Sequence, residues 1–564
     1  MKRCGWTRGL RLTAVWLGLA ARQVALGADA SVIELPPMMV EETATSVRWL
    51  YTRVDGFEFL SRCSAATTRR YAEAWQKRLQ LLRVLVPDPF LPRADLGSVV
   101  VLYPQDGKQA VSPEIQRELQ ALQSVGGDYS LGSLDRRRMG FAPNMRINDR
   151  DMHAVFVSVN EARFDASTLI VSPGYLHYLL ERRVPILPTW LIEGIDRTYL
   201  GADFVKAPIT LPPLVWANRW DSDALARDPD RPRALLPANE LFAPTSAKRG
   251  DTSSQRRLEV MLSGTELLVR WAIDSGGPQR EALWQLVSRA AEEPLTEEVF
   301  EACFGFGFSE LRDRLSDYLP RAVKEPLRID PGKLPALPRV DVRPATPNEI
   351  ARLRGEWERL AIGHVQSRLP QVRELYVEQA RRTLRKAFDA GDRDPRLLAT
   401  MGLCEIDAGH PAGAREFLEP AIAAGVVRPR AYFEVARLRF SDLRQNLPET
   451  KTFTYAELAT VLEPLRQAVQ QSPVLPEVFA LFAEAWVRST AAPAAADLAV
   501  LEQGARLFAR QTKISFFIAL ALTRHGRSAQ AKALLAAGED YLYDEATRQR
   551  FAELNKMLTS QSTR

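Results

Sequence analysis

Hydrophobic and polar residues along the first two hundred positions are spaced as in an α+β domain. Val47 to Phe59 alternates large apolar and polar residues, which predicts a hairpin around Asp55-Gly56. Short apolar runs at Val99–Tyr103 and His153–Val159 predict buried strands. A helix is predicted to begin after Ser64, since large apolar residues then recur at intervals of three and four: Tyr71, Trp75, Leu79, Leu82 and Leu85. We therefore expect a small mixed sheet with helices packed on it.

The next stretch is predicted to be mainly helical. Asp165 or Ser167 is a suitable N-cap for a helix that carries His177. The segment Trp190–Tyr199 predicts a second helix. Amphipathic spacing then continues over residues 236–319 and predicts several more helices.

The composition changes at residue 320. Seven prolines fall within residues 320–347, a density that keeps a chain extended, so we expect a linker there. Residues 348–564 then predict one helix after another.

Two segments of this helical region share one spacing of Gly, Ala and Leu: Gly409, Ala414 and Leu418 in the first, and Gly526, Ala531 and Leu535 in the second. This spacing resembles the tetratricopeptide repeat, in which small residues let paired helices pack closely. The resemblance implies a solenoid of stacked helical pairs that binds a protein or peptide. An unrelated helical bundle is the alternative.

The first residues have the composition of a secretory signal peptide. Residues 1–27 contain five basic residues and no acidic ones, and Leu12–Ala21 is an apolar run too short to span a bilayer. Cleavage is expected after Gly27 or Ala30, with an uncleaved anchor as the alternative. The predicted location is therefore the periplasm or the exterior of the cell.

Loss of the signal peptide changes what the charge implies. Removing residues 1–27 lowers the formal net charge from +6 to +1. The composition then gives no reason to expect nucleic acid or an anionic membrane surface as a partner. No later apolar run is long enough to span a bilayer, so we expect no stable membrane insertion after cleavage.

The residues with the clearest chemical content lie between Ser167 and Tyr199. Zinc peptidases carry His-Glu-x-x-His on one helix, where both His bind the metal and the Glu is the general base, and a nearby helix supplies a third ligand. Here Pro173-Gly174-Tyr175-Leu176-His177 keeps the second His, and Trp190-Leu191-Ile192-Glu193-Gly194 has a Glu in the place of the third ligand. Together with its flanking elements this stretch resembles the thermolysin-like gluzincin superfamily, in particular the secreted bacterial peptidase MA-like proteins that append tetratricopeptide repeats. The resemblance covers Val47–Leu319.

The motif departs from the family at two adjacent positions. Pro173 occupies the place of the first His and Gly174 that of the catalytic Glu, so His177 and Glu193 are the remaining metal ligands if zinc is retained. A usual catalytic zinc site has three protein ligands. Pro and Gly cost about 3 and about 1 kcal/mol inside a helix, so the helix either kinks at Ser172-Pro173 or begins there. His177 is then either a ligand beside Glu193 or its hydrogen-bond partner.

These features predict an exported protein with a degenerate gluzincin-like domain over residues 47–319. Its sheet-containing part covers 47–200 and its helical part 236–319, and an all-α solenoid follows the linker. The function we favour is that of a catalytically inactive, cofactor-free peptidase-like protein. It would bind a protein or peptide through its repeats and vestigial cleft. The alternatives are an active zinc metallopeptidase with a non-standard ligand set and a structural scaffold of the cell envelope.

Overall fold

A computed structural model shows the arrangement of these elements. It describes the following residues: 48–87, 97–104, 145–149, 151–166, 180, 187–202, 208–216, 235–242, 252–293, 295–330, 332, 334–368, 370–446, 452–508, 511–539 and 545–562. The predicted combination of a small mixed sheet near the N-terminus and a helical C-terminal region is confirmed.

The N-terminal region contains a six-stranded mixed sheet with the strand order β4-β5-β3-β2-β1-β8. Its strands are β1 (Leu50–Val54), β2 (Phe57–Ser61), β3 (Gly97–Pro104), β4 (Met145–Asn148), β5 (Met152–Val159) and β8 (Arg343–Pro344). β3 runs parallel to both β2 and β5, and the other neighbours are antiparallel. The predicted hairpin is confirmed, because Val54 pairs with Phe57 and both Asp55 and Gly56 have the positive φ that a two-residue turn needs.

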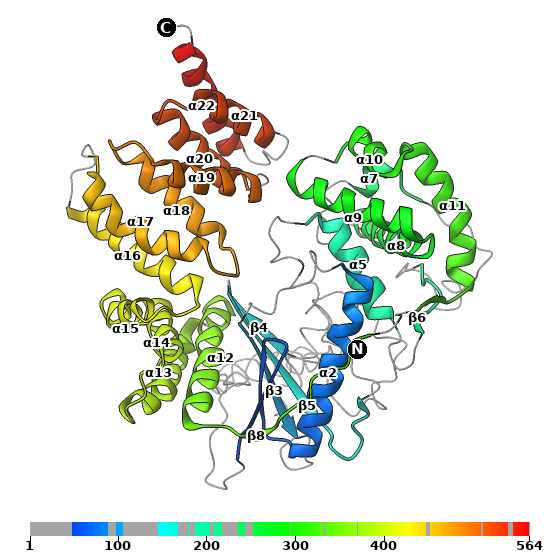
Figure 1. The fold of residues 1–564 in the computed structure, drawn as a ribbon, viewed down its shortest axis with the longest axis horizontal. Coiled ribbons are helices and arrows are strands. Elements are labelled where there is room, and N and C mark those ends of the chain that lie inside the picture. Colours follow the sequence, from blue (N-terminus) through cyan, green and yellow to red (C-terminus); the bar gives the residue numbers. More distant parts are fainter. Residues whose placement is uncertain are drawn as a thin grey trace, which may run out of the picture.

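The two faces of this sheet pack against different helices, because side chains alternate between faces along a strand. Val99 and Val101 of β3 belong to a core shared with the C-terminal helices. Val100 and Leu102 belong to a second core, which contains α2 (Ala65–Leu85). The sheet is thus the middle layer between two helical regions (Figure 1).

The helix predicted to follow Ser64 is confirmed. The Ser64 hydroxyl caps α2 by accepting the backbone N–H of Thr67 at 3.2 Å. Trp75 of α2 is fully buried, and its ring centroid lies 5.3 Å from that of Phe57 on β2. The apolar stripe read from the sequence is therefore the face that covers the sheet.

A group of helices on the α2 side completes the N-terminal region. Its members are α5 (Thr189–Gly201), α7 (Ala238–Leu241), α8 (Thr252–Asp274), α9 (Gly277–Glu292), α10 (Glu297–Phe304) and α11 (Phe308–Lys324). A two-stranded antiparallel sheet of β6 (Ile209–Leu211) and β7 (Leu327–Ile329) lies beside them (Figure 1). The predicted helical character of residues 236–319 agrees with these elements where they are described.

From Pro347 onward the chain forms successive helical pairs. They are α12 (Pro347–Arg368) with α13 (Arg373–Asp389), α14 (Pro395–Ala408) with α15 (Pro411–Ala423), α16 (Pro429–Asn446) with α17 (Tyr455–Val469), α18 (Pro476–Val487) with α19 (Ala495–Leu507), and α20 (Thr512–Arg524) with α21 (Ser528–Glu539). A short 3₁₀ turn, η4 (Pro370–Val372), precedes α13, and α22 (Glu545–Ser562) follows the last pair. The pairs stack one above another away from the sheet (Figure 1).

The Gly and Leu positions singled out in the sequence form the tight contacts of these pairs. Gly409 and Gly526 end α14 and α20 with φ of 84° and 74°, a conformation that favours glycine. Leu418 and Leu535, one helix later, are fully buried. A Cβ on Gly402 would lie 2.4 Å from Cγ of Leu418, so α14 and α15 approach closely because this residue has no side chain.

The proline-rich segment differs from the expected linker at both ends. α11 continues to Lys324 with Pro320 inside it, because a proline near the end of a helix removes one backbone hydrogen bond without breaking the earlier turns. β7 and β8 then pair with β6 and β1, and Val340 between them is buried. The segment is therefore attached to both sheets.

A buried group of charged residues joins the sheet to the helical pairs. This junction network consists of Asp149, Asp151, Glu356, Arg359, Asp407, Arg428 and Arg430. Arg359 of α12, with a side chain 1% exposed, donates to Asp149 at 2.7 Å and to Asp407 at 2.8 Å. Arg428 donates to Asp151 at 2.8 Å and to Glu356 at 2.9 Å. Two acidic residues beside β4 and β5 are thus held by arginines from α12 and the start of α16.

The arginines of the junction network outweigh burial at two of its carboxyl groups, Glu356 and Asp149. Burial opposes ionisation of Glu356, but the charges of Arg359 and Arg428 outweigh it and lower the pKa of this group to about 2. Burial is also outweighed at Asp149, whose pKa lies below its ordinary value. Burial, with the neighbouring charge of Asp149, raises the pKa of Asp151.

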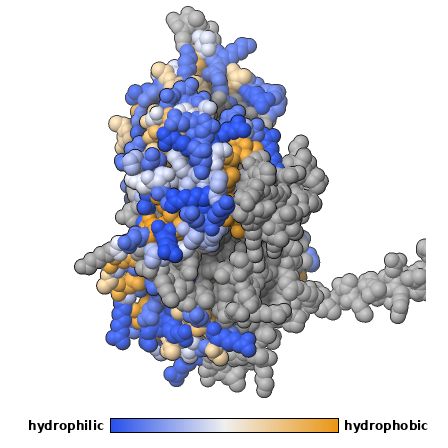
Figure 2. Space-filling view, turned by 90° about the vertical axis from the view of Figure 1, so that its right-hand side faces the viewer, coloured by the Kyte–Doolittle hydropathy of each residue, from blue (hydrophilic) through white to orange (hydrophobic). Residues whose placement is uncertain are grey.

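Where its residues are described, the face of the molecule shown in Figure 2 is largely hydrophilic. On the side shown in Figure 2, hydrophobic residues occur in separate small groups, some of them beside residues that are not described. Within the described part of the chain no helix is long and apolar enough to cross a bilayer.

Candidate functional site

The site predicted from the peptidase-like motif lies mostly outside the described residues. Pro173, Gly174 and His177 fall in that part of the chain, whereas Glu193 is on α5 and is half-buried. Among the residues that the structure does describe, no three of His, Cys, Asp or Glu come together as a metal site. The predicted pairing of His177 with Glu193 stays a prediction.

The segment around Glu193 packs as its sequence suggests. Trp190 and Leu191 are buried, and the ring centroid of Trp190 lies 5.0 Å from that of Phe242. A Cβ on Gly194 would lie 2.8 Å from the backbone oxygen of Thr265, so α5 and α8 cross at closest approach there. Trp190, Leu191 and Gly194 therefore hold α5 in place.

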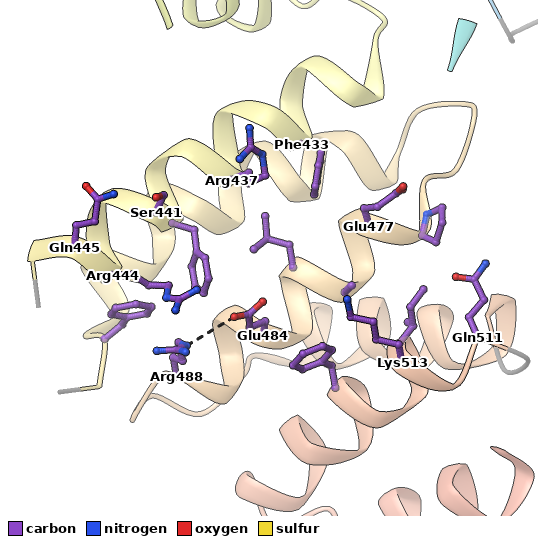
Figure 3. A pocket seen from close by; sticks show the side chains of 17 residues that line it. Phe433, Arg437, Ser441, Arg444, Gln445, Glu477, Glu484, Arg488, Gln511 and Lys513 are labelled. Carbon is purple, nitrogen blue, oxygen red and sulfur yellow. Dashed lines mark ion pairs between the residues drawn. The ribbon is translucent and has the colours of Figure 1, made fainter. Parts of the chain in front are cut away.

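The helical pairs contain a pocket that the sequence did not predict. It has a volume of about 780 Å³ and lies on the first helices of three successive pairs, α16, α18 and α20 (Figure 3). We call it the repeat groove. Its lining residues are Phe433, Arg437, Phe440, Ser441, Arg444, Gln445, Phe453, Pro476, Glu477, Ala480, Leu481, Glu484, Arg488, Gln511, Lys513, Ile514 and Phe517.

Helical periodicity places these side chains on one face of each helix. On α16 they recur at spacings of three and four from Phe433 to Arg444, and on α18 from Glu477 to Glu484. Phe453, just before α17, also lines the groove, and its backbone N–H donates to the carbonyl of Arg488 at 2.7 Å. The three helices thus present one continuous surface.

The floor of the repeat groove is apolar. Phe433, Phe440 and Leu481 are buried at 7%, 5% and 8% exposure, so they form a firm base. Ala480 and Phe517 are partly exposed above it. A side chain of a bound partner would contact Ala480 and Phe517 first.

The rim of the groove carries more positive than negative charge. Arg437 pairs with Glu434 on its own helix, and Arg488 lies 3.9 Å from Glu484, at the outer limit of an ion pair. Two further cations of the rim, Arg444 and Lys513, are exposed and make no ion pair with any described residue. The groove can therefore offer cationic hydrogen-bond donors above an apolar floor.

The comparisons with known proteins give little to set beside this geometry. No family model matches the chain and no curated protein is similar to it. One solved structure, described as the functional characterization of Pseudomonas aeruginosa pilF, is 16% identical over 37% of this chain and 88% of its own, with a TM-score of 0.25. A TM-score this low does not establish a shared fold.

Proposed function

We propose that this protein binds a protein or peptide through the repeat groove, on helical pairs that are tetratricopeptide-like. The observation that carries the proposal is the groove itself, an apolar floor with a charged rim on three successive first helices. Recognition sites of this kind combine apolar anchoring with a few polar groups that fix orientation. Stacked repeats use such extended surfaces for binding.

The N-terminal domain, in this proposal, supports binding and does not perform hydrolysis. Pro173 and Gly174 offer neither an imidazole nor a carboxylate where a zinc peptidase needs both. The signal-like residues 1–27 support export, so the binding would take place in the periplasm or outside the cell.

Filling the repeat groove is expected to weaken peptide binding strongly. Ala480 is partly exposed on α18, so Ala480→Trp places an indole in the groove without removing a buried side chain. Phage that display random dodecapeptides would be selected on the immobilised full chain. Their recovery on the variant should fall by about tenfold or more, the equivalent of at least 1.4 kcal/mol.

The matched control is Ala533→Trp, since Ala533 is exposed on the second helix α21. This variant should keep the recovery of the unchanged chain. Circular dichroism would show that both variants fold. Equal recovery on both variants would contradict binding in the groove.

The chain is expected to have no zinc-dependent peptidase activity. After incubation with zinc and dialysis, mass spectrometry should find substoichiometric metal, and labelled casein should stay intact, because the motif lacks a ligand and the general base. Cleavage that disappears in His177→Ala and Glu193→Gln, but not in the surface control Glu281→Gln, would reverse this conclusion.

A further inference from the structure

We infer that the repeat groove selects an acidic peptide segment that carries a bulky apolar side chain. The inference rests on the proposed binding function and adds the chemistry of the partner. Its basis is the placement of charge and apolar surface within the groove.

Cationic donors gather at one end of the groove. Arg444 is in the last turn of α16 and Arg488 directly follows α18, so both lie at the C-terminal ends of neighbouring first helices (Figure 3). The contact between the Phe453 N–H and the Arg488 carbonyl ties these two ends together. We call Arg444 and Arg488 the basic end.

The basic end has unused capacity for a carboxylate. Arg444 makes no ion pair with any residue that the structure describes, and the 3.9 Å contact of Arg488 with Glu484 leaves most of its donors available. A guanidinium holds a carboxylate through two parallel hydrogen bonds. An Asp or Glu side chain of a partner, or its terminal carboxylate, fits this end.

The middle of the groove fits an apolar side chain. Leu481, Ile514 and Phe517 line the groove on α18 and α20, and Phe517 is partly exposed. An acidic group at the basic end therefore leaves the rest of the partner above apolar surface. A Leu, Met or Phe a few residues away would bury itself there.

Nucleic acid fits the same surface less well. Glu477 and Glu484 also line the groove and would face a phosphate backbone. Of the four phenylalanines that line the groove, Phe433, Phe440 and Phe453 are at most 7% exposed, which leaves Phe517 as the one partly exposed ring for a base to stack on. The charge pattern favours separate carboxylates over a continuous anionic strand.

The test begins from the dodecapeptides selected on the full chain. Among clones that Ala480→Trp fails to retain, Asp and Glu together with large apolar residues should be enriched over the unselected pool. The most enriched peptide would then be synthesised, with a second version in which Asn and Gln replace its Asp and Glu. Fluorescence anisotropy should show at least about tenfold weaker binding of the amide version.

Variants of the basic end locate the effect. Arg444→Glu and Arg488→Glu should each weaken binding of the acidic peptide by about tenfold. Neither variant should change binding of the amide version by much. Arg385→Glu, on an exposed position of α13, is the control and should change neither. Circular dichroism would show that all three variants fold.

The outcomes separate the inference from the proposed function. Groove-dependent clones without acidic enrichment, or equal binding of both peptide versions, would overturn the acidic partner and leave the binding function in place. An absence of groove-dependent clones would overturn both. Displacement of the peptide by an equal concentration of a twelve-nucleotide single strand would identify nucleic acid as the partner and also overturn the inference.

Discussion

Replacement of Arg359 by methionine is expected to lower the free energy of unfolding by about 3–5 kcal/mol, since removal of one partner from a buried ion pair leaves the others uncompensated. The Arg359 side chain is 1% exposed and contacts Asp149, Glu356 and Asp407. Without it the four buried or partly buried carboxylates of the junction network share only Arg428 and Arg430 as cationic partners. Urea denaturation followed by circular dichroism measures the change.

Hydrogen exchange can test which part of the protein loses stability in Arg359→Met. Hydrogen exchange should increase in β4, β5 and α12, because Arg359 joins the sheet to the helical pairs. The control is Arg385→Met, an exposed position on α13 where a change within about 0.5 kcal/mol is expected. Equal stability of the two variants, or exchange that increases only at the C-terminal helices, would show that the junction network does not hold the two regions together.

Acidification is expected to remove about 3 kcal/mol of stability through Glu356 alone. Its pKa is about 2 in the folded protein, against an ordinary value of 4.5. A group with a lowered folded pKa stabilises the protein above its unfolded pKa, and this contribution is lost as the pH falls from about 4.5 toward 2. The free energy of unfolding of the unchanged chain should therefore fall more steeply over this range than that of Glu356→Gln.

The comparison between the two proteins isolates Glu356 from its neighbours. Asp149 shifts in the same direction, whereas the raised pKa of Asp151 acts in the opposite sense, and both groups remain in the variant. The control is Glu374→Gln, at an exposed position on α13. In this variant the free energy of unfolding should fall with pH as steeply as in the unchanged chain. If the free energy of unfolding depends on pH equally in the unchanged chain and in Glu356→Gln, Glu356 does not stabilise the network through its lowered pKa.

Local pattern was enough to predict most of the secondary structure. The turn at Asp55-Gly56, the cap at Ser64 and the ends of helices at Gly409 and Gly526 depend on backbone conformations that one or two residues decide. The prediction that the helix ends at Pro320 was wrong, because it also rested on local composition alone. The density of prolines around it indicated an extended chain, whereas the turns before it had enough hydrogen bonds to carry α11 to Lys324.

The candidate site was predicted less well. The two helices whose residues line most of the repeat groove were expected only as members of the helical series predicted over residues 348–564. Their groove residues were not, because Arg444, Arg488 and Lys513 have the spacing of ordinary solvated charges. A signal was available in the run of Phe433, Arg437, Phe440 and Arg444, which mixes aromatic and basic residues on one helix face.

By itself, the sequence determined the class of each region. Alternation and short apolar runs predicted the strands, and three- and four-residue spacing predicted the helices. The spacing of Gly, Ala and Leu, through its resemblance to the tetratricopeptide repeat, predicted the pairing of the helices. These patterns act between neighbours along the chain, so they can be read without knowledge of the fold. Tertiary structure decided which charges are buried together and where a groove forms. Asp151 contacts Arg428, and Phe433 and Ile514 line the same groove, only when helices and sheet stack in one particular order. The energy of such contacts depends on burial, which the local pattern does not contain.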